Sequence, residues 1–98
     1  MTTSQPDPQF WTIADAVINA ANAQCDVAPR TKVAAATLFA AARFNVFVLA
    51  AGASSRDELA ARSEEAIAYL TEQLGRMLRD NLDEYQANYE RYVPRPPA

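Results

Sequence analysis

The sequence predicts an all-α fold: a three-helix arrangement with a central apolar helix and a long C-terminal helix. Apolar side chains recur every three or four residues along most of the chain, and Gly occurs only twice in 98 residues. The stretch 31–52 is apolar almost all the way round, so it has to be enclosed by other helices or by lipid. This stretch therefore sets the expected architecture.

The first helix is expected over residues 8–26. Asp7 can cap the free backbone amides, and Pro8 suits the first helical position because its missing N–H costs nothing there. One broad face is apolar and comprises Phe10, Ile13, Ala14, Val17, Ile18, Ala21 and Cys25. The opposite polar stripe comprises Asp15, Asn19, Asn22 and Asp26. Cys25, the one cysteine, is therefore expected to be a buried, inert thiol.

The second helix is expected over residues 30–51. Pro29 breaks the chain before it, and Gly52 is expected to end it as a left-handed cap. Its many alanines have high helix propensity and little bulk, so other helices can approach it closely on several sides.

The third helix is expected to run from residue 55 or 63 to about 91. Ser55 and Glu58 form a capping-box pattern, and Ser63 offers a second start, so one separate turn can precede the long helix. Its shared apolar face comprises Ile67, Leu70, Leu74, Met77, Leu78, Tyr85 and Tyr92. At about 45 Å it exceeds the first two helices, and its C-terminal third is expected to overhang an antiparallel bundle. A single domain over 8–92 would then lie between a disordered N-terminus, 1–7, and a disordered Pro-rich tail, 93–98.

Composition argues against several function classes. Twelve acidic and nine basic residues are scattered without a basic block, which argues against nucleic acid as a partner. The chain has no His and one Cys, so the usual general base, a disulfide and a CxxC metal or redox pair are all missing. Residues 1–8 do not resemble a secretory signal. We expect a cytoplasmic protein that is not an enzyme, with no catalytic residue, no metal and no cofactor.

Residues 33–51 are long enough to span a bilayer, so a membrane helix is an alternative to a buried one. Eight strongly apolar side chains contribute about −0.3 to −0.6 kcal/mol each, whereas Arg43 near the middle costs about +2.5 to +3.5 kcal/mol. Asn45 adds a further cost. Because the sum is near zero and the flanking helices have water-facing sides, the sequence favours a buried helix of a soluble protein and no membrane partner.

Arg43 and Asn45 are the sharpest anomaly in the second helix, because a buried guanidinium must be paired. One interpretation is an ion pair with Asp15 on the first helix, or an arginine at the helix edge that reaches water. The alternative is a polar pocket for a small anionic molecule, formed by Asp15, Asn22, Arg43 and Asn45. That pocket would make the chain an anionic-ligand-binding protein or an enzyme subunit.

The third helix carries the expected interaction surface. Asn81 and Asn88 continue the seven-residue spacing of Ile67 and Leu74. In one interpretation these asparagines fix the register of two helices across a dimer axis. In the other they mark the place where the helix leaves the core. Three tyrosines at i, i+4 and i+7 form an aromatic ridge, which suits either a protein interface or packing within the same molecule. The predicted interface comprises Leu74, Leu78, Asn81, Tyr85, Tyr89 and Tyr92. This predicted interface indicates a protein–protein interaction module that forms a homodimer, binds another protein, or does both.

Several segments resemble a family of short, uncharacterised proteobacterial proteins, a domain of unknown function. The matching segments are Phe10, Asp15, Val17-Ile18, Ala21-Asn22, the run from Phe39 to Asn45, Met77-Leu78 and Asn81-Leu82-Asp83. The resemblance covers about residues 8–85 and implies a bacterial, cytoplasmic, all-helical protein, with no activity, substrate or cofactor. The family's polar positions match Asp15, Asn22, Arg43, Asn45 and Asn81, which implies a shared polar cluster. The tail from Gln86 onward, which includes two of the three tyrosines, is not covered.

Overall fold

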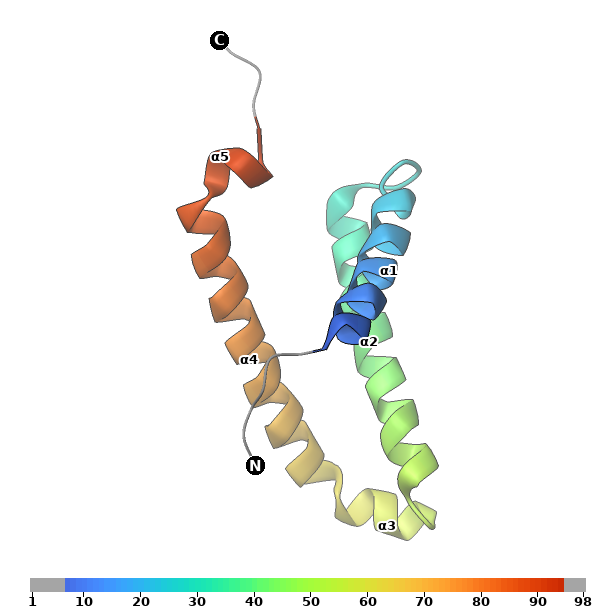
Figure 1. Ribbon diagram of the computed structural model, residues 1–98. Helices are drawn as coiled ribbons and strands as arrows, with labels where there is room; N and C mark the ends of the chain where they lie inside the picture. The colour runs from blue at the N-terminus through green and yellow to red at the C-terminus, as the bar shows by residue number, and fades with distance from the viewer. Residues whose placement is uncertain (1–6, 95–98) are drawn as a thin grey trace. The chain divides into compact units, whose positions relative to one another are not determined.

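The computed structural model describes residues 7–94, and every regular element in that range is a helix (Figure 1). The elements are α1 (Pro8–Gln24), α2 (Arg30–Gly52), α3 (Arg56–Ala61), α4 (Ser63–Ala87) and α5 (Tyr89–Tyr92). They fall into two compact units, Met1–Gly52 and Ala53–Ala98. The all-α prediction is confirmed. The sequence predicts disordered ends at 1–7 and 93–98. Of these residues, 1–6 and 95–98 lie outside the described part of the chain.

In the first unit, α1 and α2 form a helical hairpin (Figure 1). The backbone N–H of Phe10 donates to Asp7 Oδ1 at 2.9 Å, so Asp7 caps α1 as predicted, with Pro8 in the first turn. The Phe10 and Trp11 rings meet edge to face, with centroids 5.0 Å apart. Helix α1 ends at Gln24, before the expected boundary at 26, because the N–H of Cys25 donates to the Asn22 carbonyl and tightens the chain into a turn.

The two helices of the hairpin meet along a seam of small side chains. Two grooves run beside this seam, and both are lined by Ala21, Val33, Thr37 and Ala41. Val33, with 8% of its surface exposed, is the one buried hydrophobic residue among those described. Alanines on both helices leave room for a close backbone approach, but they bury little apolar area.

The hairpin does not enclose α2, contrary to the expectation of a central helix covered on all sides. Phe39, Phe44 and Phe47 are each between 63% and 65% exposed. Cys25 is also exposed, so the prediction of a buried thiol is wrong: it lies in the turn that ends α1 and lines the smaller groove beside the seam. Gly52 belongs to α2 and has no positive φ, so it is not the left-handed cap expected there.

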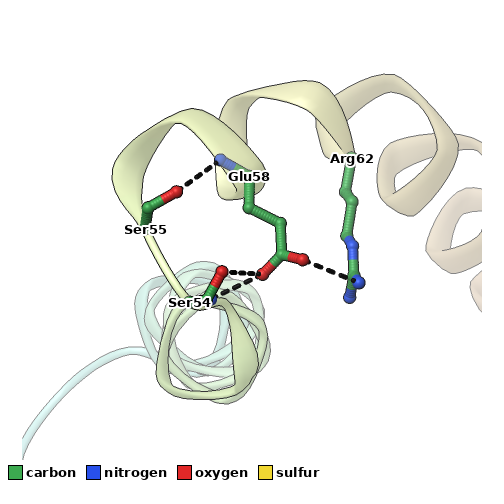
Figure 2. Close-up of polar contacts among 4 residues, drawn as sticks. All are labelled: Ser54, Ser55, Glu58 and Arg62. Atoms are coloured by element: carbon green, nitrogen blue, oxygen red, sulfur yellow. Dashed lines mark hydrogen bonds and ion pairs between the residues drawn. The ribbon is translucent and has the colours of Figure 1, made fainter.

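The second unit begins with a capped helix, α3 (Figure 2). Ser55 Oγ accepts from the backbone N–H of Glu58 at 3.1 Å, which is the first half of the predicted capping box. In the usual box the Glu58 carboxylate would accept from the backbone N–H of the N-cap residue, Ser55. Here it accepts from both the N–H and the hydroxyl of the preceding residue, Ser54. Its other oxygen pairs with Arg62 Nη2 at 3.2 Å. A separate turn of helix therefore precedes the long one.

Helix α4 begins directly after Arg62, without a side-chain cap. Ser63 does not act as the N-cap, because its hydroxyl donates to the carbonyl of Leu59 in α3. The two acids in the first turn, Glu64 and Glu65, complement the positive end of the helix dipole. The alternative starts that the sequence offered at Ser55 and Ser63 thus correspond to two consecutive helices.

The prediction of a continuous third helix that reaches residue 91 is wrong, because α4 ends at Ala87. Asn88 leaves the helical region at φ −127° and ψ 38°, and a single turn, α5, follows. Both the backbone N–H and the side-chain Nδ2 of Asn88 donate to the Glu84 carbonyl, at 3.1 and 3.2 Å. These two bonds to one carbonyl close the last turn of α4.

Candidate functional site

The end of the second unit carries a cluster of aromatic and charged side chains around Tyr92. The Tyr85 and Tyr92 rings stack with centroids 4.2 Å apart and planes at 17°. The Tyr92 hydroxyl donates to Glu84 Oε2 at 2.7 Å, and the Arg91 guanidinium lies 5.4 Å from the Tyr92 ring centroid. The hydrogen bond to the Glu84 carboxylate raises the pKa of Tyr92 above its ordinary value, because it favours the protonated phenol.

The predicted ridge of three tyrosines on one uninterrupted helix is therefore wrong. Tyr85 belongs to α4, whereas Tyr89 and Tyr92 belong to α5, and the chain bends at Asn88 between them. The bend brings Tyr92 back onto Tyr85, so two of the three rings pack within the molecule. All three remain at the surface, between 36% and 46% exposed.

Three further residues of the predicted interface lie on α4 and are accessible. Leu74 is 43% exposed and Leu78 is 54% exposed, and they lie one turn apart on the same face. Asn81, one turn further along, donates from Nδ2 to the Met77 carbonyl at 2.8 Å. That bond leaves the Asn81 side-chain oxygen for another donor, and it is compatible with either interpretation of the seven-residue spacing.

The structure does not bring the four predicted pocket residues together. Asn45 lines a groove of about 850 Å³ on one side of the hairpin seam, and Asn22 lines a groove of about 660 Å³ on the other. Asp15 and Arg43 line neither of these grooves. Helical phase explains why Asp15 and Arg43 are apart. Asp15 lies on the same side of α1 as Asn22. Arg43 lies on the side of α2 that carries Ala36 and Ala40, which line the groove that Asn22 does not line.

Two uncharged polar side chains of α2, Thr37 and Asn45, bond to their own helix. Thr37 Oγ1 donates to the Val33 carbonyl at 2.7 Å, and Asn45 Nδ2 donates to the Ala41 carbonyl at 2.8 Å. Within residues 7–94 the ion pairs are Arg62–Glu58 and Arg76–Glu72, so the expected tie between Arg43 and Asp15 is not formed. Arg43 is exposed, in agreement with the other expectation, an arginine at the helix edge that reaches water.

Helix α2 is long and apolar enough to cross a membrane, by length and composition, and 6% of its most apolar stretch is buried within the molecule. Core helices of soluble proteins and signal sequences have the same length and composition. In the described part of the chain, no group of three or more His, Cys, Asp or Glu side chains is placed to hold a metal ion.

The grooves beside the hairpin seam are the feature that sequence reasoning missed. The lining of the larger groove combines alanines with larger apolar residues such as Ile13 and Val17 on α1. The alanine spacing of both helices indicated that they could approach closely. The sequence does not specify which alanines face each other, and so it does not predict the grooves.

The comparisons with known proteins point to one family. No curated protein and no solved structure matches the chain. The model of a family described as a protein of unknown function, DUF3144, matches residues 10–86. That range includes α2 and α4 almost entirely and stops just before the bend at Asn88. The resemblance to a domain of unknown function is thus confirmed, and the chain belongs to the DUF3144 family.

Proposed function

We propose that this protein is a helical protein–protein interaction module that associates with itself through the apolar face of α4. The observation that carries the proposal is burial: among residues 7–94 only Val33 is a buried hydrophobic residue, while large apolar side chains on every long helix are exposed. Soluble monomers rarely expose contiguous apolar patches of more than a few hundred Å². Association with other chains is a direct way to cover such faces.

Helix α4 has the one-sided character of a docking helix. Its apolar stripe is exposed and comprises Ile67, Leu74, Met77, Leu78 and Leu82, each between 43% and 58% exposed. The ion pair between Arg76 and Glu72, at 3.4 Å, lies on the opposite, water-facing side. Full burial of a Leu or Met side chain contributes about 1.5–3 kcal/mol, so this stripe can supply a stable contact.

The tyrosine cluster extends this face beyond Leu82. Stacking on Tyr85 and the bond to Glu84 hold the Tyr92 ring in one orientation. A ring that is already ordered loses less side-chain entropy on binding, and tyrosine is enriched in the residues that dominate interface energies. The proposed contact therefore includes Tyr85 and Tyr92 beside the apolar stripe of α4.

The test is the solution mass of the full chain by light scattering over a concentration series. The wild type is expected to exceed the 10.7 kDa of one chain, and Leu78→Glu is expected to lower that mass at every concentration. Ala68→Glu is the matched control, because it adds the same charge on the water-facing side of α4. A wild-type mass of one chain throughout, or equal masses for the two variants, would refute the proposal.

A further inference from the structure

We propose that residues 88–92 form a C-terminal strap that the hydrogen bond between Tyr92 and Glu84 holds against α4, and that without this bond α4 continues as one helix to Tyr92. The strap consists of Asn88 and the single turn α5, which leaves the direction of α4 (Figure 1). It lies beyond residues 10–86, which the family model matches. The proposal goes beyond the proposed function, because it concerns two conformations of a single chain.

The bend before the strap does not have the usual sequence causes of a break in a helix. Sharp bends are most often found at Pro or Gly, and residues 82–92 contain neither. Asn88 is the single residue between α4 and α5, and it leaves the helical region at φ −127° and ψ 38°. A change in the two dihedral angles of this one residue would therefore join the two helices, as in other hinges.

The side chain of Asn88 does not explain the bend either. Its Nδ2 donates to the Glu84 carbonyl, four residues back, at 3.2 Å. Asn81 makes the equivalent bond to the Met77 carbonyl at 2.8 Å, and α4 continues through Asn81 without a break. The backbone N–H of Asn88 also donates to the Glu84 carbonyl, which is the ordinary bond of an α-helix. Asn88 is thus compatible with a continuous helix.

The contacts that hold the bend come from Tyr92. Its hydroxyl donates to Glu84 Oε2 at 2.7 Å, and its ring stacks on Tyr85 with centroids 4.2 Å apart. In a continuous helix, Tyr92 would lie about 10.5 Å beyond Tyr85 and about 12 Å beyond Glu84 along the axis. Side chains of a helix all lean toward its N-terminus, so they keep this separation. Both contacts of Tyr92 therefore require the bend.

The bond to Glu84 is the contact most able to select the bent form. A hydrogen bond to an ionised carboxylate is stronger and more directional than the stacking of two exposed rings. Tyr92 is 36% exposed and Tyr85 is 46% exposed, so water competes for these groups and the net gain is modest. The continuous helix gains, in exchange, the backbone bonds that cross Asn88. Loss of the one bond is therefore expected to change which form predominates.

The strap sets the length of the α4 face. In a continuous helix Tyr85, Tyr89 and Tyr92 would lie on one side, at spacings of four and three residues, and would extend the apolar face past Asn88. In the bent form Tyr92 lies back on Tyr85 and the face ends there. This consequence for docking rests on the proposed function, whereas the two conformations do not.

Protonation of Tyr92 is expected to control the strap. The groups that face its hydroxyl and ring are Glu84 and Tyr85 of α4 and Arg91 of α5. The bond to Glu84 raises the pKa of Tyr92. The bond therefore stabilises the bent form at pH values below the ordinary tyrosine pKa of about 10, and this contribution is lost as the pH rises through the raised pKa. Above it, a phenolate would face a carboxylate and the strap should open.

The first experiment measures, by NMR of the full chain, the three-bond coupling between the amide proton and the Hα of Asn88. This coupling is large at the observed φ of −127° and small at a helical φ of about −63°. Tyr92→Phe keeps the ring and removes the hydroxyl, so the coupling is expected to fall to the helical value and the ring-to-ring NOEs between positions 85 and 92 to disappear. Tyr69→Phe is the matched control, because Tyr69 is 60% exposed elsewhere on α4. Wild-type coupling and NOEs in Tyr92→Phe would overturn the proposal.

The second experiment changes the acceptor of the bond. Glu84→Ala is expected to open the strap, whereas Glu84→Gln keeps an acceptor oxygen and is expected to retain the bend. Asp80→Ala is the control, because it removes an exposed carboxylate one turn earlier in α4. A strap that stays bent in Glu84→Ala would contradict the role of the bond.

The third experiment is an alkaline titration of the four tyrosines, followed by the ultraviolet absorbance of their phenolates. One phenol of the wild type is expected to ionise after the others, and the NOEs between the Tyr85 and Tyr92 rings should disappear in the same pH range. Tyr92→Phe should lack this late step, and Tyr69→Phe should keep it. Ring NOEs that persist after all four phenols have ionised would refute the proposal.

These measurements are separate from the test of self-association. A wild-type mass of one chain at every concentration would refute the proposed function, but the Asn88 coupling and the ring NOEs would still report the strap. If Leu78→Glu lowers the mass and Tyr92→Phe leaves the coupling unchanged, the proposed function stands and the strap is lost.

Discussion

The two units of this protein are held together by different kinds of interaction. In the hairpin, α2 has apolar side chains on every side, and its polar groups Thr37 and Asn45 bond within the helix. In the second unit, charged and polar side chains make a local network of caps and ion pairs, of which Glu58 is the centre. Most of the stability that the hairpin needs must come from apolar burial, whereas α3 and the start of α4 draw on contacts between residues close in sequence. Apolar substitutions should therefore separate the units most clearly.

The largest effect is expected for the double variant Tyr85→Ala, Tyr89→Ala. Removal of two rings of the proposed interface should weaken the proposed self-association by about 1–3 kcal/mol while the helix content by circular dichroism stays the same. A light-scattering concentration series measures the change. Tyr69→Ala is the control, because Tyr69 is 60% exposed on the opposite side of α4 and should leave the mass unchanged. An unaltered mass in the double variant would exclude the tyrosines from the contact.

A smaller effect is expected when the seam of the hairpin is weakened. Val33→Ala removes two methyl groups from the one buried hydrophobic side chain described and should lower the free energy of opening of the hairpin by about 1.5 kcal/mol. Amide hydrogen exchange of α1 and α2 measures this loss. Val27→Ala is the matched control, because Val27 is 81% exposed in the turn between the helices. Equal exchange in both variants would show that the seam contributes no specific stability.

The second unit should respond to a change in backbone propensity at Gly75. A Cβ added there would meet only the guanidinium of Arg79, at an ordinary contact distance of 3.7 Å, so Gly75→Ala introduces no clash. The expected result is a gain of about 0.8–1.0 kcal/mol in helix stability, seen as slower exchange of the α4 amides. Faster exchange would indicate that another chain approaches the backbone at this position.

The smallest effect is expected from the pH dependence of the α3 cap. Bonds from the Ser54 N–H and hydroxyl, together with the Arg62 charge, lower the pKa of Glu58. A carboxyl group with a lowered pKa in the folded state stabilises it at pH values above the unfolded pKa of about 4.3, and the contribution is lost as the pH falls through the folded pKa. Glu58→Gln should remove this part of the acid dependence of α3, measured by helix content between pH 6 and pH 2. An identical acid transition in the variant would contradict it.

Local signals predicted the helix starts well. Asp7 with Pro8, Pro29, and Ser55 with Glu58 each marked a boundary through groups that interact within four residues, and such interactions do not depend on the rest of the fold. The misplaced end of the long helix has the same kind of cause, because Asn88 could equally be interpreted as a seam residue or as a helix terminator. The sequence alone did not decide which of its hydrogen bonds would form.

The candidate sites were harder to predict because they depend on how faces are paired. The pocket hypothesis needed Asn22 and Asn45 on the same side of the hairpin, but they line separate grooves. The burial of α2 was expected from its composition, but composition does not state whether the cover comes from the same chain. The exposed Phe39 and Phe47 show that the hairpin does not provide it.

The aromatic residues are divided between the units in a way that allows each to be followed separately. Trp11, the one tryptophan, stands against Phe10 in the hairpin, while all four tyrosines belong to the second unit. Indole fluorescence therefore reports on the hairpin, and near-ultraviolet circular dichroism of the stacked Tyr85 and Tyr92 rings reports on the end of the second unit. An unlabelled sample carries its own pair of optical probes, so the order in which the two units lose their structure can be read in a single melting experiment.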